Sequence, residues 1–182
     1  MQPLGYLYKK ISKTPETLSS TNVTEIYSVS SCISKNFTDY VKYWTHNGFW
    51  LFDTPDLMKS IIEKENINLS EYKLFYYEAF EKEFVFSTKT WNTFNPDEGL
   101  KTEVVLPPYK HLEGFDIVTY AGGAPGCSPL SCNGFAVDIN CNQCCLIEKL
   151  EDAVHVLDVA KDSFGEPGPY RIIAVYSVLF RN

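Results

Sequence analysis

The feature that most constrains the fold is a long apolar segment near the C-terminus. Residues 169–178 read Pro-Tyr-Arg-Ile-Ile-Ala-Val-Tyr-Ser-Val and are nearly continuous in hydrophobicity. A strand of this composition is buried on both faces, so we predict that it lies in the centre of its sheet. Further strands are predicted at 4–11 and 114–120, one long strand or a hairpin over 72–86, and a short buried strand at 49–52, from their β-branched and aromatic side chains.

Helices are predicted where apolar residues recur every three or four positions. This spacing occurs over 36–46, 54–66 and 150–162, and a shorter helix is predicted over 129–137. Helices and strands intermix without a regular βαβ rhythm. We therefore expect one α+β domain spanning 1–182, with a mixed, mainly antiparallel β-sheet packed by three to four helices.

Length and charge narrow the classes of function. A chain of 182 residues fits a single domain. Its net charge of −7 argues against nucleic acid as a ligand, because binding nucleic acid begins with neutralising phosphates. No apolar run is long enough to cross a membrane and the N-terminus lacks a secretory pattern, so we expect a cytoplasmic protein. In that compartment the six cysteines are expected to be reduced thiols.

Five of the six cysteines lie between residues 127 and 145, and three interpretations compete for them. The first is a zinc site formed by Cys127, Cys132, Cys141 and Cys144. Cys141 and Cys144 have the spacing of one half of such a site, but the gap from Cys127 to Cys132 is wide for the other half. Because only one half of the zinc-binding spacing is present, no cofactor is predicted.

The second interpretation is a reactive thiol. A cysteine in the first turn of a helix is stabilised as thiolate by the positive end of the helix dipole, and Cys132 is predicted there. His111, which precedes the strand leading to this turn, is the candidate base. Asn133 is a candidate to orient the base or to donate to an oxyanion.

The third interpretation is structural. Free cysteines behave as small apolar residues and are often buried. The hydroxyls around Ser128 then cap a helix by bonding its free backbone N–H groups.

Two other groups of residues are candidate binding positions. Trp44, His46 and Trp50 are close in sequence across a predicted helix–strand turn and could line a pocket. Arg171 at the start of the last strand could bind an anion, although an ion pair with Glu166 or Asp162 explains it equally simply.

Four runs of sequence resemble a family of small, uncharacterised bacterial proteins. They are 25–34 (Glu-Ile-Tyr-Ser-Val-Ser-Ser-Cys-Ile-Ser), 44–53 (Trp-Thr-His-Asn-Gly-Phe-Trp-Leu-Phe-Asp), 127–133 (Cys-Ser-Pro-Leu-Ser-Cys-Asn) and 167–172 (Pro-Gly-Pro-Tyr-Arg-Ile). Proteins of this kind travel as isolated genes in mobile gene cassettes, so the resemblance implies an independent, single-domain module. It implies no activity.

The chain also departs from that family at one position. The family has His where this chain has Cys144, which weakens any site built on Cys144. The resemblance therefore favours Cys127, Cys132, Asn133 and Cys145 as site residues.

Together these patterns predict a binding module for a small molecule or a protein partner, acting as a homo-oligomer. Its pocket is expected near the 127–133 turn and the 44–53 aromatics. One alternative is a cysteine-dependent enzyme that uses Cys132 with His111. Another is an immunity or antitoxin-like protein whose acidic surface meets a basic partner.

Overall fold

The structure is a computed structural model that describes residues 1–30, 32, 49–94, 103–121, 124–161, 164–166 and 168–179. The predicted helix over 36–46 lies outside these residues. Trp44 and His46 lie outside them as well.

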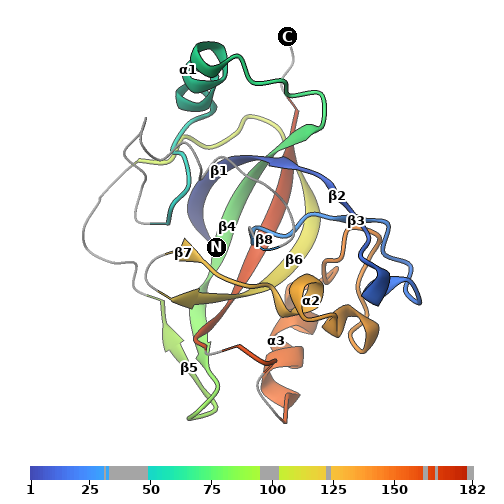
Figure 1. The fold of residues 1–182 in the computed structure, drawn as a ribbon. Coiled ribbons are helices and arrows are strands. Elements are labelled where there is room, and N and C mark those ends of the chain that lie inside the picture. The colour runs from blue at the N-terminus through green and yellow to red at the C-terminus, as the bar shows by residue number, and fades with distance from the viewer. Residues whose placement is uncertain are drawn as a thin grey trace.

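A single antiparallel sheet forms the centre of the molecule (Figure 1). Its strand order is β1-β4-β8-β6-β7, and β5 pairs with β4. The paired strands run antiparallel throughout the described chain, which confirms the predicted α+β class. The strands are β1 (Gln2–Lys10), β4 (Tyr72–Val85), β5 (Thr90–Thr93), β6 (Lys110–Ala121), β7 (Ala124–Pro125) and β8 (Tyr170–Val178).

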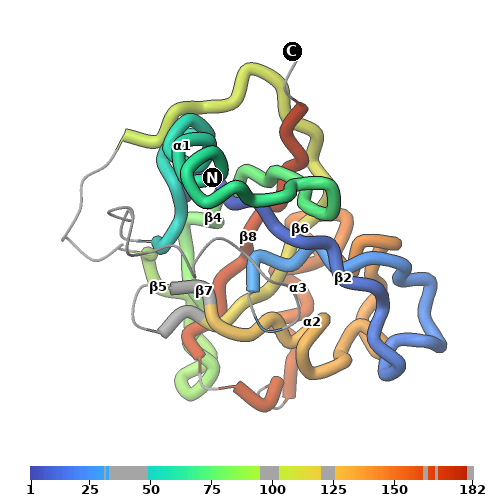
Figure 2. The backbone as a smooth tube through the Cα atoms, turned by 45° about the horizontal axis from the view of Figure 1, so that its top comes forward, coloured from blue at the N-terminus to red at the C-terminus, as the bar shows by residue number. Residues whose placement is uncertain are grey.

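The smaller elements pack at the ends of this sheet. Helix α1 lies at one end, whereas α2 and α3 lie near the other, and the same separation is visible in the turned view (Figures 1 and 2). The ribbon of β2 and β3 pairs separately from the main sheet. These elements are β2 (Ser12–Lys13), η1 (Glu16–Leu18), β3 (Glu25–Ile26), α1 (Pro55–Glu65), α2 (Pro129–Cys132), η3 (Phe135–Val137) and α3 (Leu150–Val159).

Strand β8 lies between β4 and β6, as its apolar sequence predicts. Its side chains alternate between two buried cores. Ile173 and Val175 belong to the core that includes Met58 of α1, whereas Ile172 belongs to the core that includes Leu157 of α3. Both faces of this strand are therefore covered, which explains why its sequence has no polar alternation.

The long elements match the sequence-based predictions closely. Helix α1 begins after Thr54, whose hydroxyl accepts a hydrogen bond from the N–H of Leu57, and Pro55 occupies its first turn. Strand β4 extends over 14 residues. Helix α3 forms where it was predicted but ends at Val159.

Two short elements differ from prediction. The strand predicted at 49–52 is a bend in which Phe52 alone bridges to Tyr6 of β1. The helix predicted over 129–137 is interrupted at Gly134, whose φ of 76° leaves the helical region, so that α2 ends at Cys132 and η3 follows. The segment 49–52 thus pairs with the sheet through a single bridge.

No described helix has the length and the apolar composition that a membrane crossing requires.

Candidate functional site

Three cysteines from two separate segments of the chain converge at one place. The sulfur atoms of Cys32, Cys127 and Cys132 all lie within 4.8 Å of one another, the one such group of potential metal ligands in the described residues. Cys32 Sγ lies 2.9 Å from Cys127 Sγ. Cys32 is exposed, and the other two are partly buried. The site is therefore open to solvent on the side of Cys32.

Cys127 is positioned by the end of β6. The N–H of Thr119 donates to the carbonyl of Cys127 at 2.9 Å, and the N–H of Gly126 donates back to the carbonyl of Thr119 at 2.7 Å. Cys132 follows on the single turn of α2, where its N–H donates to the carbonyl of Ser128 at 2.8 Å. Cys127 and Cys132 thus lie on one rigid turn.

Cys32 reaches the site along the extended segment that follows β3. This segment is held onto the sheet at Ser28 and Val29, which both donate to the carboxylate of Asp116 in β6. The hydroxyl of Ser30 accepts from the N–H of Cys32 at 3.2 Å and lies 3.7 Å from the sulfur of Cys132. Ser30 therefore contacts two of the three cysteines.

Asp116 connects the two segments that carry the cysteines. Its side chain is fully buried and accepts hydrogen bonds from the hydroxyls of Ser28 and Ser128, each at 2.6 Å, and from the N–H of Val29 at 3.2 Å. Burial raises the pKa of this carboxyl, while the two serine hydroxyls and the charge of Lys9 act in the opposite direction. The carboxylate thereby fixes the cysteine-bearing segments relative to each other.

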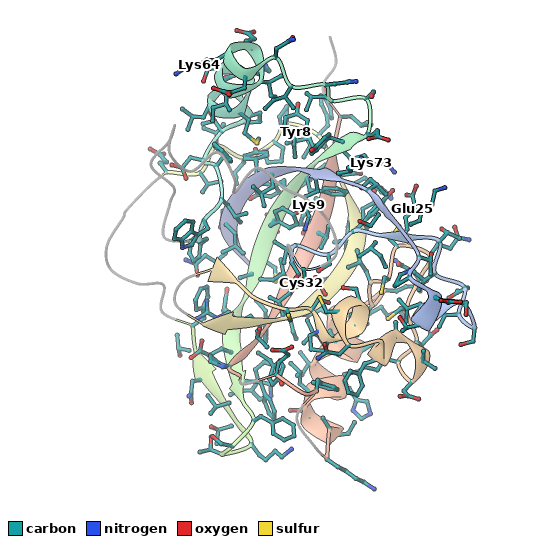
Figure 3. All side chains as sticks on the ribbon, in the orientation of Figure 1. Tyr8, Lys9, Glu25, Cys32, Lys64 and Lys73 are labelled. Carbon is teal, nitrogen blue, oxygen red and sulfur yellow. The ribbon has the colours of Figure 1, made fainter. Side chains whose placement is uncertain are left out.

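Lys9 of β1 is the buried positive charge of the site. Only 1% of the residue is exposed, and its ammonium donates to the carbonyl of Ser28 at 2.5 Å and to that of Ser30. Burial lowers the pKa of Lys9 to about 7, although the charges of Asp116, Cys132 and Cys32 favour its protonated form. Figure 3 shows Lys9 and Cys32 near the centre of the molecule, with Cys32 beside α2.

The three thiols have different acidities. Burial raises the pKa of Cys32, but hydrogen bonds from Cys127, Ser30 and Cys132 outweigh it and hold the pKa of Cys32 below its usual value. The hydrogen bond with Cys32, followed by burial, raises the pKa of Cys127. Burial likewise raises the pKa of Cys132. Cys32 is therefore the most acidic thiol of the group.

A tyrosine hydroxyl is buried in the core that includes Met58. The oxygen of Tyr77 has no hydrogen-bond partner among the described residues, and burial, reinforced by the charge of Asp116, raises its pKa well above the usual value. This hydroxyl stays neutral, so it adds no negative charge beside Asp116.

The structure brings together part of the predicted site. Cys127, Ser128 and Cys132 take part in it. The hydroxyl of Ser128, however, bonds to Asp116 and makes no cap to α2, so the predicted capping role is wrong. Cys132 is the last residue of the four-residue helix α2 and lies at the negative end of its dipole, so the dipole argument for its thiolate fails.

The remaining cysteines lie elsewhere. Cys141 and Cys145 are buried in the core beneath α3, and the hydrogen bond with Cys141 raises the pKa of Cys145. Cys144 lies in a turn, and its carbonyl oxygen accepts a hydrogen bond from the N–H of Tyr27. The four cysteines of the predicted zinc site are thus not gathered in the described structure, where Cys32 completes the group instead.

His111 and Asn133, the other candidate catalytic residues, have different surroundings. His111 is exposed and pairs with Ser177 near the start of β6, five residues before Asp116 and hence about 17 Å along the strand. It is not brought to Cys132. The amide of Asn133 donates to the carbonyl of Phe164 at 2.7 Å, which holds the chain that follows α3.

Two candidate binding residues also lie away from the cysteines. Arg171 forms an ion pair with Glu83 at 2.8 Å, an acid that sequence proximity did not suggest. Asp162 lies outside the described residues. Trp50 is partly buried beside the Phe52 bridge to β1, with a φ of 60°.

Sequence reasoning missed Cys32, Lys9 and Asp116. Cys32 lies 95 residues from Cys127, and no spacing rule connects them. Asp116 did carry a signal, because an acidic residue within an apolar strand needs buried hydrogen-bond partners. Lys9 resembled an ordinary surface lysine, since it stands beside Lys10.

Comparisons with known proteins add no relative to this description. No family model matches the chain, and neither a curated protein nor a solved structure does. The resemblance to small bacterial proteins of mobile gene cassettes therefore stays a prediction.

Proposed function

We propose that this protein exchanges thiols with small disulfides, using Cys32 as the attacking thiolate and Cys127 as the resolving thiol. The observation that carries the proposal is the 2.9 Å separation of their sulfur atoms, with Cys32 on the exposed side. It keeps the expectation of a cysteine-dependent activity but assigns the nucleophile to Cys32. Neither His111 nor another histidine is used as its base.

The chemistry follows thiol–disulfide exchange. The Cys32 thiolate attacks one sulfur of a disulfide, forms a mixed disulfide and releases the other half as thiolate. The Cys127 thiol then loses its proton and attacks Cys32 Sγ, which forms the Cys32–Cys127 disulfide and releases the second half. The small disulfide gains two electrons, and the protein dithiol loses two.

The acidity and the exposure of Cys32 suit the attacking role. An attacking thiol needs exposure and thiolate character, both of which Cys32 has. A sulfur–sulfur bond is about 2.05 Å long, so the two sulfurs must approach by less than about 1 Å. Lys9 adds positive charge on the buried side, which favours the thiolate.

The test is stopped-flow reaction of the reduced protein with an aromatic disulfide reagent, 5,5′-dithiobis(2-nitrobenzoate), at one equivalent. Wild type should release two equivalents of the coloured thiolate in a fast phase, because Cys127 displaces the second half. Cys127→Ser should slow the second release at least tenfold, and Cys32→Ser should abolish the fast phase.

Cys144→Ser is the matched control, because that thiol lies outside the cluster, and it should behave as wild type. A fast phase that survives Cys32→Ser would overturn the assignment of the nucleophile. The homo-oligomer and the basic protein partner stay predictions.

A further inference from the structure

The three sulfur atoms also match the requirements of a metal site. We infer that the reduced protein binds one zinc ion through Cys32, Cys127 and Cys132, with a fourth coordination position open to solvent. This inference shares two cysteines with the proposed thiol exchange but does not rest on it.

The geometry is close to that of a zinc–thiolate site. A Zn–S bond is about 2.3 Å, so sulfurs on a tetrahedral ion lie about 3.8 Å apart. The three sulfurs already lie within 4.8 Å of one another. The main adjustment is a widening of the Cys32–Cys127 pair from 2.9 Å by about 1 Å, and Cys32 lies at the exposed end of its segment.

Ser30 and Asp116 hold the segments that carry the three cysteine ligands in place. Ser30 contacts both Cys32 and Cys132, and Asp116 joins the segments that carry all three cysteines through Ser28 and Ser128. Such outer hydrogen bonds orient metal ligands and are part of a working site. The cluster is thus preformed by groups that do not themselves compete for the metal.

Charge favours a divalent ion of the zinc class. Three thiolates and Zn²⁺ carry a net charge of −1, and the same thiolates with a monovalent ion carry −2. Lys9 supplies one positive charge on the buried side, while Asp116 is already engaged by two hydroxyls and one N–H. The lower charge of the zinc complex is the one that a single lysine can balance.

The number of ligands indicates the kind of site. Structural zinc sites are closed by four protein ligands, whereas sites that act on a ligand keep one position free. Cys32 is the exposed member of the group, so the free position faces solvent. A water or a small anionic ligand would complete the coordination there.

The test is titration of the reduced full-length protein with Co²⁺ and Zn²⁺ under a phosphine reductant, followed by X-ray absorption of the zinc form. Wild type should bind one Zn²⁺ per chain, with three sulfurs at about 2.3 Å and one lighter ligand. Cys132→Ser should lower the affinity at least 100-fold, as should Cys32→Ser, whose exposed position leaves folding intact. Cys144→Ser should bind as wild type.

The two proposals fail in different ways. Cys132→Ser should lose the metal yet still release two equivalents of thiolate, because it retains Cys32 and Cys127. The releases should be slower than in wild type, since the variant removes a hydrogen bond that lowers the pKa of Cys32. The metal site is overturned if wild type binds no zinc, if Cys132→Ser binds zinc as tightly as wild type, or if the bound zinc has fewer than three sulfur ligands. None of these results contradicts the proposed thiol exchange. Near-ultraviolet circular dichroism of each variant shows that it is folded.

Discussion

At the scale of single residues, the site depends on two buried charges of opposite sign. Burying an ionised side chain costs several kcal/mol unless hydrogen bonds and an opposite charge compensate it. Asp116 is compensated by three donors, and Lys9 donates to two carbonyls of the segment that leads to Cys32. Removing either side chain therefore breaks hydrogen bonds that hold the segment leading to Cys32.

The shifted pKa of Lys9 predicts how stability depends on pH. Lys9 titrates at about 7 in the folded protein and at 10.5 in the unfolded chain, so between these values the unfolded chain binds more protons. The contribution of Lys9 to the free energy of unfolding should then rise with pH from about 7 to 10.5, with a slope that approaches about 1.4 kcal/mol per pH unit.

Urea denaturation of wild type and Lys9→Met at several pH values measures this contribution as a difference. The difference should grow in favour of wild type as the pH rises through this window. Lys64→Met is the control, because that ammonium is exposed on α1 (Figure 3) and keeps its hydration in both states. A difference that is flat between pH 7 and 10 would contradict the buried position of Lys9.

At the scale of elements, the site depends on the turn that joins β6 to α2. Gly126 lies against Thr119, where an added Cβ would meet the Thr119 hydroxyl at 2.4 Å and its carbonyl oxygen at 3.2 Å. The hydrogen bond between the two backbones sets the position of the next residue, Cys127. A side chain at position 126 would thus displace a cysteine of the cluster.

Gly126→Ala should lower the free energy of unfolding by about 1–3 kcal/mol, because it overpacks a buried contact. It should also slow the second thiolate release in the disulfide assay. In Gly126→Ala combined with Thr119→Ala the hydroxyl is gone, and both properties should return towards those of Thr119→Ala alone. A Gly126→Ala variant as stable and as fast as wild type would show that this contact does not position Cys127.

The elements also show which parts of the fold can be predicted from sequence. Strand β8 is a long apolar run and helix α1 has a clear cap, so local sequence decides them. For 72–86 the sequence left a strand or a hairpin open, and the structure has one strand of 14 residues over Tyr72–Val85. The strand expected at 49–52 and the helix expected over 129–137 are short, and long-range bridges or a single glycine decide their form. Local sequence carries little information about such contacts.

At the scale of the whole molecule, the antiparallel sheet brings distant segments together. Strands β1 and β6 lie on opposite sides of the β4–β8 pair, yet Lys9 from one and Asp116 from the other both hold the chain between Ser28 and Ser30. Cys127 and Cys132 were predictable as a pair because only four residues lie between them. Cys32 was not, because its place is fixed by this topology and not by spacing.

The most direct test of the account is to map the first disulfide formed when the reduced protein is oxidised with diamide at neutral pH. Trypsin places Cys32 alone in peptide 14–35 and the other five cysteines together in peptide 111–149. Mass spectrometry should find these two peptides joined within one chain, with fragmentation assigning the partner as Cys127. Oxidation confined to peptide 111–149 while Cys32 stays free, or a first link from Cys32 to a different cysteine, would contradict the account.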